Sequence, residues 1–263
     1  ACVFVAVPRT ASRTMLAALR RAPRARIIEG RGLEGACSLD AWFGQLRAGR
    51  GVAFAGRAFR GRAGAWRRLR RACAACQAAR ARLFFDGGQG GARLFFDHVP
   101  FLETLQGRAA HVAVLRRPLD WAASHYYFLA NSPRALADEL VDGGAAFFAA
   151  RSAQARYLCG AAPRCAAPWA QSSRELLNRF AAVGVHDDLE RSLASFEAAL
   201  PRVFRGARAA FAAQRARRAA PQAGDLRRPR AEVLPDAAAL ALRRALAEDI
   251  ALYRAARARL FRP

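Results

Sequence analysis

The sequence predicts an α/β fold in which a mostly parallel central sheet is flanked by helices. Short apolar segments alternate with stretches of helical spacing, a pattern typical of parallel strands joined by crossover helices. An apolar segment at residues 3–7 leads through a polar turn into a helical run at residues 15–21. A second strongly apolar segment, residues 111–115, ends at Arg-Arg-Pro and continues as a helix over residues 119–129. The length of 263 residues suits one domain with a sizeable core, so we expect a single domain over residues 1–263.

The remaining elements follow the same pattern along the chain. We expect strands at residues 26–29, 51–55, 94–97 and 181–185, and helices at residues 38–46, 172–180, 187–200 and 237–260. An Arg- and Ala-rich stretch at residues 57–82 also favours a helix. The tetrapeptide Leu-Phe-Phe-Asp occurs at residues 83–86 and again at residues 94–97, which indicates either a β-hairpin or a small internal duplication.

The first strand, turn and helix predict an anion-binding loop. Free N–H groups and the positive end of the helix dipole face the loop before a helix, and both favour a phosphate group. Hydroxyl and guanidinium groups gather in the same loop, at Arg9, Thr10, Ser12, Arg13 and Thr14. The pattern G-x-x-x-x-G-K-[ST] is absent, so the loop is not of the ATP-binding type.

The charge of the chain predicts an anionic partner. The formal net charge is +24, from 44 basic and 20 acidic residues, and every basic residue is arginine. A compositional bias explains why arginine replaces lysine, but the excess itself favours nucleic acid, a sulfated glycan or a phosphorylated cofactor. No apolar stretch approaches the length of a membrane span, and the N-terminus lacks the features of a signal peptide. Because the first strand begins at once, we expect a domain cut from a longer chain.

The six cysteines favour an oxidising compartment. Cys159 and Cys165 bracket a short turn with Gly and Pro, a spacing that suits a local disulfide with a stabilising effect of about 2–3 kcal/mol. Cys73 and Cys76 form a C-x-x-C pair without a second pair at zinc-site spacing, so no metal is expected.

Five segments, in order, resemble the uronosyl 2-O-sulfotransferases, Golgi enzymes that sulfate heparan, dermatan or chondroitin chains. They are residues 7–14, 98–102, 114–129, 159–165 and 183–190, the last continuing to residues 198–206. The resemblance implies a P-loop-like sulfotransferase fold and the donor PAPS (3′-phosphoadenosine 5′-phosphosulfate). It also implies transfer of a sulfuryl group to the 2-hydroxyl of a uronic acid in a glycosaminoglycan-like polysaccharide.

The resemblance assigns catalytic roles to Arg9 and His98. Arg9, Thr10, Ala11, Ser12, Arg13 and Thr14 fall where the family binds the 5′-phosphosulfate. The family usually has Lys at the position of Arg9, and arginine stabilises a departing phosphate but does not donate a proton at neutral pH. His98 occupies the position of the general base, a role that suits a neutral imidazole. His125 replaces a family aromatic residue and receives no chemical role.

Further arginines complete the implied site. Arg116 and Ser124 match the position that binds the 3′-phosphate of the donor, while Arg117 stands where the family commonly has an acidic residue. Arg228 matches a contact to the donor phosphate, and Arg227 and Arg134 match contacts to the acceptor. The alternative for Arg227 and Arg228 is a solvated basic loop.

The implied partner is a sulfated or uronic-acid-containing polysaccharide, and neither nucleic acid nor a metal is expected. By the same resemblance the protein is a type II single-pass protein of the Golgi lumen. The heparan branch of the family is trimeric, and whether this chain forms such a homo-oligomer stays open. Three alternatives stay open: a nucleotide kinase or NTPase, a non-catalytic module that binds heparin or nucleic acid, and a catalytically impaired sulfotransferase relative. Which glycan is the acceptor also stays open.

Overall fold

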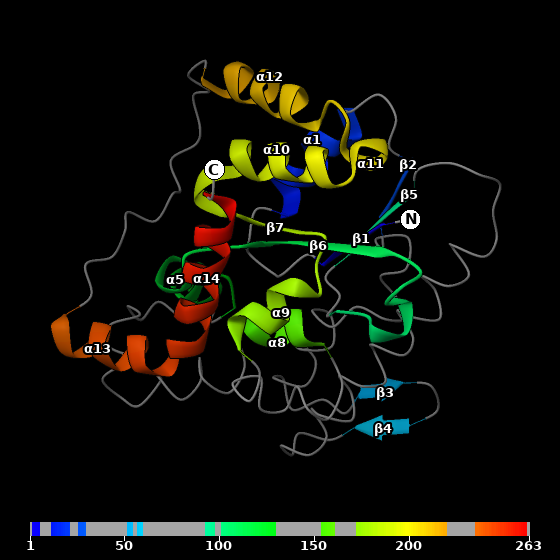
Figure 1. Cartoon of the computed structure of the whole chain (residues 1–263). Coiled ribbons are helices and arrows are strands. Elements are labelled where there is room, and N and C mark those ends of the chain that lie inside the picture. Colours follow the sequence, from blue (N-terminus) through cyan, green and yellow to red (C-terminus); the bar gives the residue numbers. More distant parts are fainter. Residues whose placement is uncertain are drawn as a thin grey trace.

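The structure is a computed structural model, and it describes residues 2–5, 12–21, 26–29, 52–54, 57–59, 93–97, 101–129, 154–160, 172–219 and 235–261. These residues build a five-stranded sheet with the strand order β2-β5-β1-β6-β7. Helices cover both of its faces (Figure 1). The predicted α/β fold with a parallel sheet is therefore confirmed.

All neighbouring strands of this sheet are parallel, so their carboxyl ends lie at one edge. The strands are β1 (Cys2–Val5), β2 (Arg26–Glu29), β5 (Arg93–Asp97), β6 (Ala110–Leu115) and β7 (Ala182–Val185). Val5, the last residue of β1, pairs with Asp97 on one side and with Ala113 on the other. At the far side of β6, Leu115 pairs with Val185. The ends of β5, β1, β6 and β7 therefore follow one another along this edge.

Strands β1, β6 and β7 are buried on both faces, which explains why they are apolar without alternation. One face packs against α1 (Ser12–Arg21), α10 (Leu189–Ala199), α11 (Pro201–Phe204) and α12 (Ala207–Ala219). The other packs against α8 (Gln154–Cys159), α9 (Ser173–Asn178), α14 (Ala247–Leu260) and the 3₁₀ turn η2 (Glu103–Leu105). Figure 1 shows the first group above the sheet and α8 and α9 below it.

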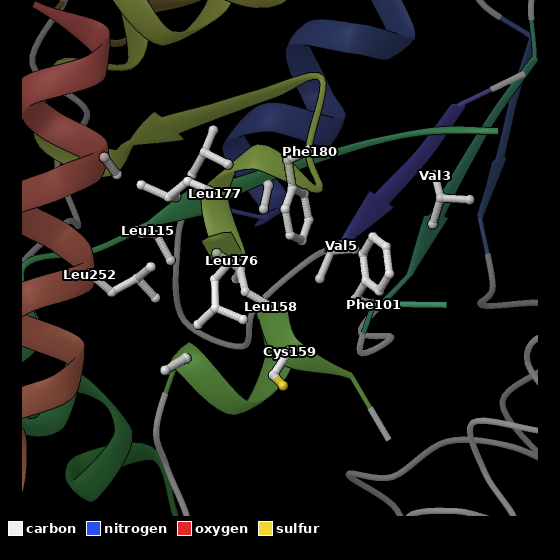
Figure 2. Close-up of a cluster of buried hydrophobic side chains, with 14 of the residues drawn as sticks. Val3, Val5, Phe101, Leu115, Leu158, Cys159, Leu176, Leu177, Phe180 and Leu252 are labelled. Atoms are coloured by element: carbon white, nitrogen blue, oxygen red, sulfur yellow. The ribbon is translucent and has the colours of Figure 1, made fainter. Parts of the chain in front are cut away.

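Side chains of β1 alternate between these two layers. Val3 and Val5 belong to the cluster on the α8 and α9 side (Figure 2), whereas Cys2 and Phe4 belong to the cluster under α1 and α10. A third cluster joins α5 (Pro118–Leu129) to α13 (Asp236–Ala245) through Trp121. Within the described ranges, no helix is long and apolar enough to cross a membrane.

Gly184 allows helix α10 to lie directly on strand β7. A Cβ atom at this position would lie 2.4 Å from the Cβ of Ser192. The Ser192 hydroxyl accepts a hydrogen bond from the N–H of Val185 at 2.8 Å and lies 2.9 Å from the Val185 carbonyl oxygen. This contact fixes the end of β7 and the 3₁₀ turn η6 (His186–Asp188) that follows it.

Some sequence predictions were wrong. Residues 57–59 form strand β4 (Arg57–Phe59), antiparallel to β3 (Val52–Phe54), and not the start of a helix. Two residues separate these strands, which is the usual spacing of a β-hairpin. Residues 94–97 lie in β5, which pairs with β2 on one side and β1 on the other, and residues 83–86 lie outside the described residues.

The C-terminal helix predicted at residues 237–260 is interrupted. It divides at Leu246, whose φ of −108° and ψ of 17° leave the helical range. Leu246 is buried beside Trp121 in the cluster of α5 and α13, so α13 packs there while α14 turns onto the sheet. Helix α12 was not predicted, α1 begins earlier than expected, and the helix predicted at residues 38–46 lies outside the described residues.

Candidate functional site

The strand order predicts a ligand site at the carboxyl edge between β1 and β6. The chain leaves β1 through α1 on one face and reaches β2 on one side of the sheet. It leaves β6 through α5, α8 and α9 and reaches β7 on the other side, with α8 and α9 on the opposite face. Such a reversal leaves a crevice at the strand ends, where open α/β sheets bind their ligands.

Three predicted groups of site residues follow neighbouring strand ends. The anion-binding loop connects β1 to α1, and Ser12, Arg13 and Thr14 are the first residues of α1. Arg116 is the first residue after β6, and His98 is the first after β5. Strand β1 lies between β5 and β6. The chain positions predicted for the general base, the anion-binding loop and the contact to the 3′-phosphate therefore follow three neighbouring strands.

Several predicted residues lie outside the described residues. They are Arg9, Thr10, Ala11, His98, Arg134, Cys165, Arg227 and Arg228. Their roles stay predictions. Cys159 is buried at the end of α8 and is disulfide-bonded, and its pairing with Cys165 also stays a prediction.

Arg116 is half-buried, and its main chain is held by a side chain from helix α8. Its N–H donates to Oε1 of Gln154 at 2.9 Å, and its carbonyl accepts from Nε2 of the same side chain at 2.8 Å. Burial lowers the pKa of Arg116, and the carboxylates of Asp120 and Asp187 oppose this shift. The two hydrogen bonds with Gln154 hold the backbone from which this guanidinium group extends.

Helix α5 continues from Arg116 and carries the second residue predicted to contact the 3′-phosphate. It begins at Pro118, a favourable first helical residue because proline has no N–H to leave unpaired. Ser124 lies in this helix and is half-buried. Arg116 and Ser124 thus belong to one strand end and the helix that follows, as the resemblance implies.

Acidic side chains balance Arg117, the residue that departs from the family pattern. Its guanidinium lies 3.7 Å from Asp120 and 3.9 Å from Asp187. The hydroxyl of Tyr253 on α14 donates a hydrogen bond to Asp187. Arg117 therefore adds little uncompensated charge at this edge.

His186, just after β7, stays neutral beside Arg116. Burial lowers its pKa, and the positive charge of Arg116 lowers it further, against the raising effect of Asp187 and Asp120. A neutral imidazole at this edge leaves the charge there to the arginines and aspartates. Across the described ranges, no group of three or more His, Cys, Asp or Glu side chains could hold a metal ion.

The sequence analysis missed Gln154 and Asp249. Gln154 is hydrogen-bonded to the main chain of Arg116, and Asp249 in turn is hydrogen-bonded to the main chain of Gln154. Asp249 on α14 is buried, and its two carboxylate oxygens accept hydrogen bonds at 2.9 Å from the N–H groups of Gln154 and Ala155. The available signal was weak: Asp249 is one of two adjacent acidic residues in the last helix, and Gln154 opens a short segment that also contains Arg156.

The fold and this edge together define a doubly wound α/β protein with a candidate anion site at its strand ends. No protein-family profile matches the chain. The chain is 30% identical to heparan sulfate 2-O-sulfotransferase 1 of Xenopus laevis over 137 residues, covering 43% of this chain and 38% of the relative. The proteins of the same name from Gallus gallus and Homo sapiens are each 29% identical with the same coverage.

These relatives confirm the resemblance to the uronosyl 2-O-sulfotransferases. The alignment covers well under half the length of the curated relatives, 38% in each case. The activity, substrate and partners of the whole protein are therefore taken up as proposals.

Proposed function

We propose that this chain is a PAPS-dependent sulfotransferase that acts on a uronic-acid-containing polysaccharide. The observation that supports it most is the strand order β5-β1-β6. That order places the ends of three neighbouring strands at one edge of the sheet. His98, the anion-binding loop at residues 9–14 and Arg116 follow these three strands along the chain. The similarity to heparan sulfate 2-O-sulfotransferase 1 supports the same class of reaction.

The reaction is an in-line displacement at sulfur. His98 accepts the proton of the uronic acid 2-hydroxyl while the hydroxyl oxygen forms a bond to the sulfur atom. The bond from sulfur to the bridging phosphate oxygen breaks, and 3′-phosphoadenosine 5′-phosphate (PAP) leaves with the negative charge. Arg9 and the N–H groups of the loop stabilise that charge, and no covalent intermediate with the protein forms.

Donor and acceptor are held by separate groups of residues. Residues 9–14 bind the 5′-phosphosulfate, while Arg116, Ser124 and Arg228 bind the phosphates of the donor. Arg227 and Arg134 contact the acidic groups of the acceptor. The excess of arginine draws the polyanionic acceptor to the protein, so binding weakens as salt is added.

The same resemblance extends to the whole protein. Residues 1–263 form one sulfotransferase domain, and the complete protein is a type II membrane protein of the Golgi lumen that assembles as a trimer. The Cys159–Cys165 disulfide stabilises the turn after α8 in that oxidising compartment.

A non-catalytic polyanion-binding module is the second candidate, favoured by the net charge of +24. Thermal unfolding separates the two functions. PAP raises the melting temperature of a sulfotransferase and ATP does not, whereas neither nucleotide stabilises a module without a donor site.

Sulfate transfer tests the proposal directly. Radiolabelled PAPS is incubated with heparosan, dermatan and chondroitin acceptors, and the labelled products are analysed as disaccharides. We expect label on the uronate 2-oxygen and a fall of about 100-fold or more for His98→Ala, because a positioned general base contributes that much. His125→Phe is the matched histidine control and should retain activity. Full activity of His98→Ala would contradict the proposed base, and no transfer to any acceptor would contradict the enzymatic function.

A further inference from the structure

Gln154 contacts Arg116 as a neighbouring strand would. Its side-chain amide donates to the carbonyl and accepts from the N–H of one residue, at 2.8 and 2.9 Å. Both polar ends of a buried side chain, 1% exposed, are used in this contact. The residue that follows β6 is therefore held on both of its main-chain polar groups.

Helix α14 fixes the helix that carries Gln154. The two oxygens of Asp249 accept the N–H groups of Gln154 and Ala155, each at 2.9 Å. These N–H groups have no acceptor within a short helix such as α8, because they belong to its first turn. Asp249 thereby sets the orientation of α8, and with it the direction of the Gln154 side chain.

The far end of α8 is fixed as firmly. The N–H of Phe101 donates to the Tyr157 carbonyl at 2.7 Å, and Arg179 donates to the Cys159 carbonyl at 2.8 Å. Gly160 closes the helix with a φ of 106° and lies against Phe101. A helix held at both ends is a rigid support for Gln154.

We propose that Gln154 is a positioning residue for the sulfate donor: by holding the Arg116 main chain, it directs the guanidinium to the 3′-phosphate. The inference rests on the proposed function. A loosely held residue would lose about 1–2 kcal/mol of conformational entropy on binding, so a backbone already ordered favours the ligand that needs Arg116. Gln154 therefore controls how strongly the protein prefers nucleotides with a 3′-phosphate to those without one.

The test compares the affinities of PAP and AMP, which differ by the 3′-phosphate alone. Calorimetry with the full chain gives both dissociation constants and their ratio. In Gln154→Met, which keeps the length of the side chain but removes both hydrogen bonds, we expect PAP affinity to fall about tenfold and AMP affinity to stay unchanged. Gln154→Glu retains the acceptor but loses the donor. Its ratio of PAP affinity to AMP affinity should therefore lie between those of the unmodified protein and Gln154→Met.

Gln214 supplies the matched control. It is also a buried glutamine, on α12 at the opposite face of the sheet, and within the described part of the chain its Oε1 has no hydrogen-bond partner. Gln214→Met should leave the ratio of PAP to AMP affinity unchanged. A general loss of packing, in either variant, would lower the affinities for PAP and AMP by the same factor.

The outcomes separate the inference from the function on which it rests. If the unmodified protein binds PAP no better than AMP, the proposed function fails. If it prefers PAP and a folded Gln154→Met keeps the whole preference, the positioning role is overturned while the function stands. If Gln154→Met does not fold, the ratio measured for Gln154→Glu decides in the same way.

Discussion

Charged and polar side chains are largely buried at the amino end of strand β6 and partly exposed at its carboxyl end. At the amino end, His111 packs 4.4 Å from the ring of Phe101, and the Arg179 guanidinium lies 3.9 Å from the centre of the same ring. Arg179 also forms an ion pair with Glu103 at 3.0 Å. At the carboxyl end, the side chain of Arg117 is 58% exposed and its ion pairs are 3.7 and 3.9 Å long.

The difference teaches which end of the sheet is scaffold and which is site. The amino end is packed inside the protein: His111 lies against the rings of Phe101 and Phe180, and its buried Nε2 has no hydrogen-bond partner among the described residues. The carboxyl end keeps several charges partly in solvent around Arg116, where a phosphate can reach them. We therefore expect changes at the amino end to alter stability and changes at the carboxyl end to alter nucleotide binding.

The largest effect is expected at Gly160, near the amino end. Its φ is +106°, and a Cβ would lie 2.8 Å from the carbonyl oxygen of Phe101. Gly160→Ala should lower the free energy of unfolding by about 3 kcal/mol, from the unfavourable backbone region and the close contact together. Gly107, with a φ of +82° and open space around its Cβ position, is the control. Equal losses for the two alanine variants in urea unfolding would refute the contact with Phe101.

Arg116→Ala should have the next largest effect, on binding. A charge-assisted hydrogen bond contributes about 2 kcal/mol, which corresponds to a loss of about 30-fold in PAP affinity. The free energy of unfolding should stay close to that of the unmodified protein, because the side chain is half-buried. Calorimetry and urea unfolding measure the two quantities. If the variant loses stability but keeps its PAP affinity, Arg116 stabilises the fold and does not bind the donor.

The pH dependence of stability distinguishes the supports at the two ends. Burial raises the pKa of Asp249 from 3.8 to about 7. The folded protein therefore keeps a proton that the unfolded chain releases, and stability falls as the pH rises through this window. Between pH 5.5 and 7.5 the loss is about 2 kcal/mol from this group. Asp249→Asn should flatten this slope in unfolding experiments, and an unchanged slope would contradict the burial of an ionisable group there.

His111 at the amino end should give the opposite slope. Burial lowers its pKa from 6.5 to about 4, so the unfolded chain binds a proton that the folded protein does not. Stability then falls as the pH drops from 6.5 towards 4, by about 1–2 kcal/mol at pH 5. His111→Phe should reduce this sensitivity to acid. If the variant and the parent lose stability equally between pH 7 and 5, another group is responsible.

The sequence carried the order of the elements at the carboxyl edge. Apolar runs ended by polar residues marked β1 and β6, and the resemblance to the uronosyl 2-O-sulfotransferases assigned a role to the arginine after β6. The supports of Arg116 were not predictable, because Gln154 and Asp249 lie 38 and 133 positions further along the chain. Only the folded structure shows that α8 and α14 meet behind β6. The break at Leu246 was missed because helical spacing continues through it, while tertiary packing turns the chain.

The central claim is that the carboxyl edge between β1 and β6 binds the sulfate donor. Calorimetric titration of the full chain with PAP tests it most directly, with ATP and AMP as comparison ligands. We expect one PAP site per chain, with clearly weaker binding of AMP and of ATP. No binding of PAP, or equal binding of all three nucleotides, would contradict the account.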